Sequence, residues 1–591
     1  MFDQDPQRVC ILQGPVAVKH STVKDEPIGE LLGNVTAKLV EKLVERSYGG
    51  DTSKIPTVDY LAPPAEDVDI PDEVECEESS ISTTYNIGNV VPETSEWLEA
   101  ISGSELNWLK ALLTSKTICQ GQAYIDNPLR RALTPRRGQR VVVNSEGEYP
   151  TSVTVYGAGR SYGFHKSDFK AIEIAYAASS SLIDVTLVED RRAVSVPLFL
   201  RFRYVPSMGS MPIHEVSEGR NGRIKDFYWR LWFGDDQSRP ELDIRETFIG
   251  PEVVISANDV ETFCNVVGNQ NEAFKTARTE IVKAPMDFAI VTGWQVSTLR
   301  YCCAVKITLC QAIMRSIFPD AIDGDLLKLV HLSNGFRLVP GAKPLRAGDA
   351  CIADAHIASV KNTDAGKVVQ VKGHVFRDGQ PIIEVVSSFL YRGRFDDYEH
   401  TFETVDEPDY VVQLINDAAV GVVQSKEWLS WEDETIPPKA GMTLVFRIQS
   451  QVTFKDKTSY RDICVSGDVY MRDQLKRLKK VASVEFNQEG CHGNPVVEYL
   501  QRHGVPEGRL TPLTNGGYTM SNNAPTTFTT PLSNEPYSVI SGDFNPIHVN
   551  PYFADFAALP GTITHGMWSS AATRRYVENI VAEGNPDRVI A

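Results

Sequence analysis

Runs of apolar residues with two different spacings alternate along the chain from about residue 94 onward. Apolar residues at helical spacing predict helices over 97–113, 294–318 and 495–503. Short runs rich in β-branched residues predict strands over 151–156, 183–187, 194–204, 350–360, 367–376, 381–391, 410–414, 442–451, 462–470 and 482–486. Asp378-Gly379 is typical of the tight turn of a hairpin between two of these strands. Long helices combined with mostly antiparallel strands predict the α+β class.

The length of 591 residues exceeds what one hydrophobic core accommodates and predicts roughly three to five domains. Changes in pattern and composition mark six segments. Residues 1–62 are too few for a domain and look like the tail of an upstream region. Prolines and acidic residues make 63–93 an extended, solvated linker. The remaining segments are an α+β scaffold domain (94–249), two strand-rich domains (250–398 and 399–504) and a final segment (505–591).

Composition excludes several classes of protein. The formal net charge of −18 leaves no general basic face for a nucleic acid. No run of about 18 apolar residues is present, so we expect no membrane segment. The ten cysteines include no CxxC pair, which indicates buried thiols in a reducing compartment and no metal centre. We therefore expect a cytoplasmic protein.

The final segment holds a dense group of residues that can carry chemistry. It contains Tyr537-Ser-Val-Ile-Ser-Gly-Asp-Phe-Asn-Pro-Ile-His548, followed by Leu559-Pro-Gly-Thr-Ile-Thr-His-Gly-Met-Trp568. The first string resembles the motif of the MaoC-like hydratases and dehydratases, and the second resembles the start of that family's central helix. The resemblance implies hot-dog folds, in which a curved antiparallel sheet wraps a long helix. With the predicted elements, we expect several of them in a pseudo-symmetric arrangement, the last one truncated.

Dehydration of a 3-hydroxyacyl thioester needs a base for the α-proton, an acid for the leaving hydroxyl and donors for the thioester oxygen. The resemblance assigns His548 as the base toward C2 and Asp543 as the acid, with Asn545 bracing the turn between them. Gly566 begins the expected helix, so its N–H has no partner within the helix and can face an oxyanion. Its missing Cβ lets a substrate approach. For His565 we favour a structural role, because the glycine after it supplies the donor.

A degenerate copy of the pattern lies upstream, at Gly268-Asn-Gln-Asn-Glu-Ala-Phe274. Aligning Gly268 with Gly542 places Asn269 at the position of Asp543 and Phe274 at that of His548. The second element recurs as well, since Gly293 follows Gly268 by 25 residues and Gly566 follows Gly542 by 24. The matched spacing indicates an internal repeat whose upstream half is non-catalytic. We expect the two copies to pack as partners in a double hot dog.

Four further stretches resemble the β subunit of fungal-type fatty-acid synthases: Arg8–Ala17, Asp126–Arg131, Ser152–Gly157 and Phe389–Gly393. The resemblance covers the chain in order and implies a dehydratase segment of a multifunctional synthase. Its substrate would be (3R)-3-hydroxyacyl-carrier-protein and its product the trans-2-enoyl form. The implied partners are an acyl carrier protein with a phosphopantetheine-linked chain and the other domains and subunits of the synthase. Residues 1–62 would then end an enoyl-reductase-like region, and 399–504 would be an extra, structural hot-dog-like domain between two halves.

No cofactor is expected for the dehydratase, whereas FMN and NADPH would serve other domains of such a synthase. Two alternatives remain open: an (R)-specific enoyl-CoA hydratase and a purely structural scaffold fragment of the synthase. The upstream copy runs 125 residues from Gly268 to Gly393, whereas 49 residues follow Gly542. We therefore expect the catalytic hot dog to be incomplete and this chain alone to be weakly active or inactive.

Overall fold

The computed structural model describes residues 80–86, 107–115, 117–119, 122–124, 139–147, 149–156, 170–191, 194–234, 238–278, 280–290, 312–475, 477–490, 493–507 and 529–590. The chain forms two compact units and passes between them several times. The first unit comprises Met1–Ser238, Tyr518–Val539 and Asp543–Tyr576, and the second comprises Arg239–Gly517, Ile540–Gly542 and Val577–Ala591. The expectation of an enoyl-reductase-like tail at 1–62 lies outside the described residues.

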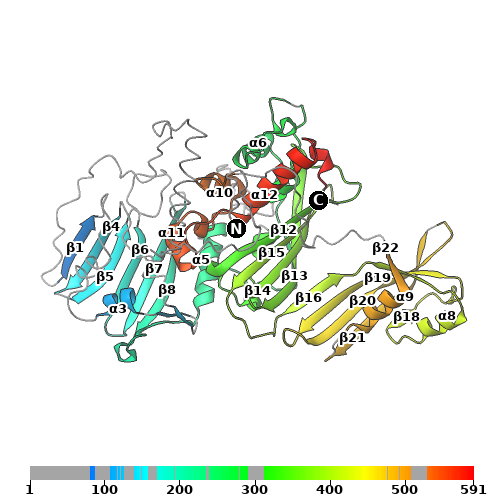
Figure 1. The fold of residues 1–591 in the computed structure, drawn as a ribbon, viewed down its shortest axis with the longest axis horizontal. Coiled ribbons are helices and arrows are strands. Elements are labelled where there is room, and N and C mark those ends of the chain that lie inside the picture. Colours follow the sequence, from blue (N-terminus) through cyan, green and yellow to red (C-terminus); the bar gives the residue numbers. More distant parts are fainter. Residues whose placement is uncertain are drawn as a thin grey trace, which may run out of the picture. The chain divides into compact units, whose positions relative to one another are not determined.

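A nine-stranded sheet dominates the first unit (Figure 1). Its order is β1-β4-β5-β6-β7-β8-β9-β2-β3, and β4 to β9 follow one another as an antiparallel meander. The strands are β1 (Ser80–Asn86), β2 (Thr117–Cys119), β3 (Gln122–Tyr124), β4 (Arg140–Glu146), β5 (Tyr149–Tyr156), β6 (Lys170–Ala177), β7 (Leu182–Arg191), β8 (Val194–Tyr204) and β9 (Ile213–Glu215).

The three strands predicted in this region, 151–156, 183–187 and 194–204, are confirmed by β5, β7 and β8. The assignment of 63–93 to a linker is wrong at its end, because Ser80–Asn86 pairs with β4 along its whole length. Its serines, threonines and Ile81 suit an edge strand, and the acidic run before it hid that signal.

Two helices accompany this sheet. α3 (Trp108–Thr114) confirms the end of the helix predicted at 97–113, whose first residues lie outside the described ones. α5 (Arg220–Phe233) was not predicted, since its sequence contains a glycine and several aromatic residues of modest helix propensity. Burial compensates for that, because most of the helix is buried, including its apolar and aromatic side chains Ile224, Phe227, Tyr228, Trp229, Leu231 and Trp232. Tertiary packing rather than local preference therefore stabilises α5.

A thirteen-stranded sheet forms the frame of the second unit (Figure 1). Its main path is β12-β15-β14-β13-β16-β19-β20-β21-β18. The strands on this path are β12 (Leu329–Leu338), β13 (Ala350–Thr363), β14 (Gly366–Arg377), β15 (Gln380–Arg392), β16 (Phe402–Asp406), β18 (Leu429–Trp431), β19 (Thr443–Phe454), β20 (Tyr460–Arg472) and β21 (Leu478–Glu489). Beside it, β10 (Thr247–Ile249) and β11 (Val253–Val254) pair with β13, and β17 (Asp409–Gln413) pairs with β19 and β22 (Gly504–Glu507).

The strands predicted between 350 and 486 are confirmed within a few residues. Asp378 and Gly379 both have positive φ, +52° and +71°, as a type I′ hairpin turn requires. The sheet does not stop at the predicted boundary between 398 and 399, because β16 pairs with β13 on one side and β19 on the other. Hydrophobic pattern marks strands but not which of them continue into one sheet.

Helices pack against parts of this frame. α9 (Pro495–His503) confirms the predicted helix and buries Val496 and Leu500 in a cluster with side chains of β17, β19, β20 and β21. Of the helix predicted at 294–318, Ala312–Arg315 is helical (α7), and 291–311 lie outside the described residues. α6 (Ala257–Val266) and α8 (Asp417–Gln424) complete the set. Mostly antiparallel sheets with separate helices agree with the α+β class, while the arrangement as several hot dogs stays a prediction.

The two copies of the repeat share local backbone geometry. Gly268 and Gly542 have φ of +73° and +72°, a conformation that residues with a Cβ rarely adopt. Three residues later, Asn271 and Asn545 each cap a three-residue 3-10 helix, Glu272–Phe274 and Pro546–His548. The sequence alignment of the copies therefore describes a real structural correspondence. Their packing as partners stays a prediction.

The degenerate copy has acquired a contact of its own within the second unit. Asn271 Nδ2 donates to Glu578 Oε1 (2.6 Å) and to the carbonyl of Gly584 (2.9 Å), and Asn269 Nδ2 donates to Glu578 Oε2 (3.4 Å). Asn269 and Glu578 are completely buried. A carboxylate in the position of Asn269 would face another carboxylate without a donor between them, which explains why an amide suits this half of the repeat.

The structure bears on two expectations, the absence of a membrane segment and the burial of the cysteine thiols. Among the described residues, no helix combines the length and apolar character that crossing a membrane requires. Cys264 and Cys351 are free and buried as expected, but Cys464 is free and exposed, so the prediction of buried thiols is wrong there. Its side chain points outward from β20, where alternation exposes every second residue.

We predict that Asn269→Asp lowers the free energy of unfolding by roughly 1–3 kcal/mol, because a buried donor is lost beside Glu578. Chemical denaturation measures this change. Asn416→Asp is the matched control, since Asn416 caps α8 at an exposed site and an aspartate caps equally well. Adding Glu578→Gln should recover much of the loss, and equal stabilities of the Asn269 and Asn416 variants would contradict the prediction.

Candidate active site

Short capped turns hold the motif residues in the first unit. α10 (Glu535–Ser541) ends at the positive-φ Gly542, and the chain turns at Asp543, whose Oδ1 accepts from the N–H of Asn545 (3.1 Å). Asn545 Oδ1 then caps the 3-10 helix Pro546–His548, and Asn550 caps α11 (Pro551–Phe556). An Asn followed by Pro favours such a helix start twice in succession, because proline at the first position needs no N–H partner.

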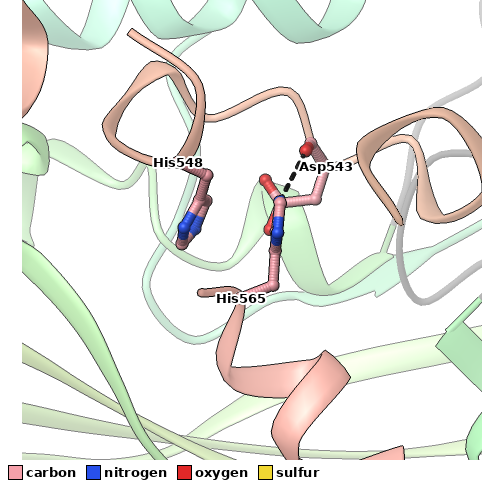
Figure 2. Close-up of side chains that lie close together, drawn as sticks. All are labelled: Asp543, His548 and His565. Carbon is pink, nitrogen blue, oxygen red and sulfur yellow. Dashed lines mark hydrogen bonds between the residues drawn. The ribbon is translucent and has the colours of Figure 1, made fainter. Parts of the chain in front are cut away.

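These turns bring three ionisable side chains together (Figure 2). One donor atom each from Asp543, His548 and His565 lies within 4.8 Å of the other two. The rings of His548 and His565 stack with centroids 3.8 Å apart and an angle of 25° between their planes. His548 is 7% exposed and His565 1%, whereas Asp543 keeps partial contact with solvent. The predicted pair is thus brought together, and its placement in a substrate-sized cleft stays a prediction.

The orientation of His548 follows from one hydrogen bond. Its Nδ1 lies 2.7 Å from the carbonyl oxygen of Ile563. A carbonyl oxygen only accepts, so Nδ1 carries the proton of the neutral imidazole and Nε2 carries the lone pair. Asn534 strengthens this arrangement, because its Nδ2 donates to the carbonyls of both His548 (2.9 Å) and Ile563 (3.0 Å). The ring is therefore held at Nδ1, and Nε2 is the nitrogen that can accept a proton.

Burial shifts the two groups of the predicted pair in opposite directions. Loss of hydration raises the pKa of the Asp543 carboxyl, a shift that His548 only partly offsets. The same loss lowers the pKa of His548, partly offset by Asp543. The pKa of His565 lies well below its ordinary value, again because the ring is buried. Both shifts favour the uncharged form of each side chain relative to its form in water.

Gly566 is the first residue of α12 (Gly566–Tyr576) and is exposed, directly after the buried His565. N–H groups in the first turn of a helix have no intrahelical acceptor, and the helix dipole makes this end favourable for negative charge. The structure thus places Gly566 at the helix start that the sequence predicted. The direction of its N–H toward a substrate stays a prediction.

The nine-stranded sheet and α5 contact the motif within the first unit. Tyr228 of α5 donates its hydroxyl to Asn545 Oδ1 (3.0 Å), and the ring of Phe227 stacks on that of Phe553 with centroids 5.2 Å apart. Asn550 Nδ2 donates to Glu189 Oε2 of β7 (2.8 Å). A further hydrogen bond joins Gln139 and Tyr552, both buried. The scaffold domain therefore holds the loop that carries Asp543 and His548.

Sequence reasoning missed Asn534 and the scaffold residues. Asn534 lies three residues before the motif, and its position just before Glu535-Pro536 was a possible helix-start signal. Tyr228, Gln139 and Glu189 lie more than 300 residues from their partners. No local pattern marks such residues, because only the folded chain brings them together.

The cluster of Asp543, His548 and His565 also bears on metal binding. Among the described residues, it is the group of carboxylate, imidazole and thiol donors close enough together to hold an ion. Two neutral imidazoles and a carboxylate form a donor set that suits several divalent transition metals. Because these residues could hold an ion, a reaction without a metal is a proposal that needs its own test.

Comparison with known proteins supplies the family. Five family models match the chain, and three of them carry fatty acid synthase in their descriptions. They are the fatty acid synthase subunit beta/Fas1-like helical model (1–32), the fatty acid synthase meander beta sheet domain (88–235), the FAS1-like dehydratase domain region (246–385), the fatty acid synthase subunit beta insertion domain (402–500) and the MaoC like domain (514–591).

Curated relatives match along the whole chain. The fatty acid synthase subunit beta of Schizosaccharomyces pombe is 41% identical over 99% of the chain, and that of Saccharomyces cerevisiae is 38% identical over 100%. In each case the chain spans 28% of the relative's length. A solved MaoC-like dehydratase aligns over 56% of the chain with 14% identity and a TM-score of 0.28, too weak a likeness to carry an argument. Matches in order from residue 1 to 591 show that the chain belongs to the family of fungal fatty acid synthase β subunits, as their dehydratase region.

Proposed function

We propose that the chain catalyses the syn elimination of water from a (3R)-3-hydroxyacyl thioester to give the trans-2-enoyl thioester. The observation that carries this proposal is the approach of Asp543 to His548, whose donor atoms lie within 4.8 Å of each other while Nδ1 of His548 is held by the carbonyl of Ile563. Burial raises the pKa of Asp543 and lowers that of His548, which favours the uncharged form of each. Acid–base elimination needs both groups in these states at once. A purely structural role would leave the desolvation of two adjacent ionisable groups without a benefit.

The proposed reaction begins at the α-carbon. The hydrogen bond from Nδ1 to Ile563 leaves the lone pair of His548 on Nε2. This nitrogen removes the proton from C2 of the substrate. The C2–C3 double bond forms as the C3–O bond breaks, and Asp543 transfers its proton to the departing oxygen. The pair then holds an imidazolium and a carboxylate, and return of the proton from His548 to Asp543 restores the starting state.

The thioester carbonyl gains negative charge while the α-proton leaves. We assign its stabilisation to the N–H of Gly566 at the start of α12. The exposed backbone of this glycine gives a carbonyl oxygen access, and the glycine has no Cβ to obstruct it. Placement of one such donor contributes substantially to acyl chemistry, and removal costs on the order of 10²–10³ in rate in comparable sites.

The substrate carrier and the partners belong to the same proposal. The named relatives are fatty acid synthase β subunits, and this supports an acyl chain held by the phosphopantetheine arm of an acyl carrier protein within a larger cytoplasmic assembly. We propose no metal or organic cofactor for this step, because a thioester-flanked proton can be removed by histidine with oxyanion stabilisation alone. An (R)-specific enoyl-CoA hydratase would use the same residues and differ in its carrier.

We predict that Asp543→Asn and His548→Gln each lower kcat/KM by roughly 10²–10⁴-fold, since each removes one proton-transfer group. The ultraviolet absorbance of the enoyl thioester reports the reaction, with carrier-protein and CoA substrates compared. Because the chain spans 28% of its relatives' length, the substitutions are also measured in a complete synthase β subunit, in which we expect stronger turnover.

Matched controls are Asp226→Asn and His503→Gln, which alter exposed residues of the same kinds. Retained activity in either dyad variant, in a protein that folds, would refute the assignment. Preference for CoA over the carrier protein would favour the hydratase alternative, and loss of activity on chelation would refute the cofactor-free mechanism.

The pH dependence of kcat/KM follows from the directions of the two shifts. His548 can act as a base only when it is neutral. Because its pKa is lowered, it stays neutral at pH values somewhat below about 6.5, and activity falls only at still lower pH. Asp543 works only when protonated, and its pKa is raised above about 3.9, so activity falls as pH rises through that raised value. A bell-shaped profile is expected, with apparent values that belong to the pair. An acid limb centred at or above about 6.5 would contradict it.

The contact of α5 with the catalytic turn gives a further prediction. Tyr228→Phe removes the hydroxyl that donates to Asn545, and we expect kcat to fall roughly three- to ten-fold while KM stays nearly constant. The reason is that the turn loses placement without losing a group that contacts substrate. Steady-state kinetics measure the split, with Tyr149→Phe, an exposed tyrosine, as the control. Unchanged kcat in the Tyr228 variant would show that the turn needs no support from the scaffold.

A further inference from the structure

Asn534 occupies a buried position at which only half of its amide group is satisfied. Its side chain is 7% exposed, and its Nδ2 donates to the carbonyl oxygens of His548 (2.9 Å) and Ile563 (3.0 Å). Its Oδ1 is buried as well, and no group among the described residues donates to it. A buried acceptor without a donor is unfavourable by roughly 1–3 kcal/mol. The two N–H groups of the amide, and not its oxygen, therefore account for an asparagine at this position.

The orientation of the amide follows from its two partners. Carbonyl oxygens only accept, so the nitrogen of Asn534 faces them, and its two hydrogens can serve one carbonyl each. An aspartate has almost the same shape but supplies no N–H2 group, and an apolar side chain supplies no donor at all. One nitrogen atom therefore joins His548 to Ile563, which are 15 residues apart along the chain.

The two joined segments hold different parts of the proposed catalytic machinery. The first is the turn that carries His548, the proposed base. The second contains Ile563, whose carbonyl accepts from His548 Nδ1 (2.7 Å), and it leads into Gly566 at the start of α12. The N–H of Ile563 also donates to the carbonyl of Ile547 (3.2 Å). Asn534 thus completes a network that contains the base, the acceptor that orients it and the segment just before the proposed oxyanion donor.

We propose that Asn534 is a positioning residue, which holds His548 and the start of α12 at the separation that the reaction needs. This inference rests on the proposed dehydration. In that reaction the α-proton leaves to His548 while the thioester oxygen gains charge beside Gly566, so both groups must be aligned with one substrate at the same time. Asn534 transfers no proton and acts through the carbonyls of His548 and Ile563. By holding the Ile563 carbonyl beside the ring, it also keeps the proton of the neutral imidazole on Nδ1.

Asn534→Asp tests this role with the least change of shape, because the carboxylate keeps the size of the amide and both carbonyls lose their donor. We expect kcat to fall roughly ten- to hundred-fold while KM stays nearly constant, since placement is lost without loss of a reacting group. Dehydration is measured in a complete synthase β subunit by the absorbance of the enoyl thioester. Asn534→Ala removes the donors without adding a charge and should give a loss of the same order.

Asn362→Asp is the matched control. Asn362 is 8% exposed, lies in the second unit and donates its Nδ2 to the carbonyl of Asp397 (2.7 Å), and its Oδ1 is likewise buried without a donor among the described residues. Its substitution therefore also removes a buried amide donor from a main-chain carbonyl. We expect lower stability in both aspartate variants but a lower kcat only at Asn534. An equal fall of kcat in the Asn362 variant, or an unchanged kcat in a folded Asn534 variant, would overturn the inference.

The tautomer of His548 gives a readout that does not depend on turnover. In the 591-residue chain labelled with ¹⁵N-histidine, the protonated Nδ1 and the unprotonated Nε2 of His548 should give well-separated resonances at neutral pH, assigned by their loss in His548→Gln. In Asn534→Ala, exchange between the two tautomers should draw these resonances together, because the Ile563 carbonyl is no longer held beside the ring.

This readout separates the inference from the proposed function. Resonances that stay apart in Asn534→Ala would overturn the role of Asn534, even where the dehydration is confirmed. Resonances that converge, together with full activity of the Asp543 and His548 variants, would refute the proposed reaction alone. If the Asn534 variants do not fold, the unsubstituted chain still tests the inference, because averaged Nδ1 and Nε2 resonances there would already overturn it.

Discussion

The hydrogen bond from His548 Nδ1 to the carbonyl of Ile563 is the interaction on which the site depends. It selects the tautomer of the ring, and through Asn534 it joins the turn that carries His548 to the segment that leads into α12. A buried imidazole without this bond would have two equivalent tautomers and no defined basic nitrogen. The orientation of His548 is therefore set by a main-chain acceptor.

Burying Asp543 and His548 is unfavourable, and contacts elsewhere in the first unit stabilise the loop that carries them. Burial raises the pKa of Asp543 and lowers that of His548, because it destabilises the charged form of each side chain. Contacts from the nine-stranded sheet and α5 hold the loop in place: the hydroxyl of Tyr228, the carboxylate of Glu189 and the stacked ring of Phe227. A domain without reactive groups of its own thus contributes the rigidity that acid–base chemistry needs.

The degenerate copy shows how one backbone serves two purposes. The same positive-φ glycine and asparagine cap recur in both halves, yet Asn269 stands at the position of Asp543 and Phe274 at that of His548. The amides of Asn269 and Asn271 bind Glu578, just beyond the end of α12 at Tyr576. The upstream copy thus makes a buried structural contact, because amide donors satisfy a buried carboxylate where a second carboxylate would repel it.

The sequence by itself determined the elements with strong local signals and the short turn on which Asp543 and His548 lie. The hairpin at Asp378-Gly379, the strands from 350 to 486, α9, and the short turn that joins Asp543 to His548 all follow from neighbouring residues, since turns and caps are local interactions. Only the tertiary structure decided what depends on distant contacts. α5 forms because its aromatic face is buried, β1 because β4 offers a free edge, and the sheet crosses residue 398 because β16 pairs on both sides. The tautomers of His548 and His565 belong to this second group, because each is set by a carbonyl at least 15 residues away along the chain.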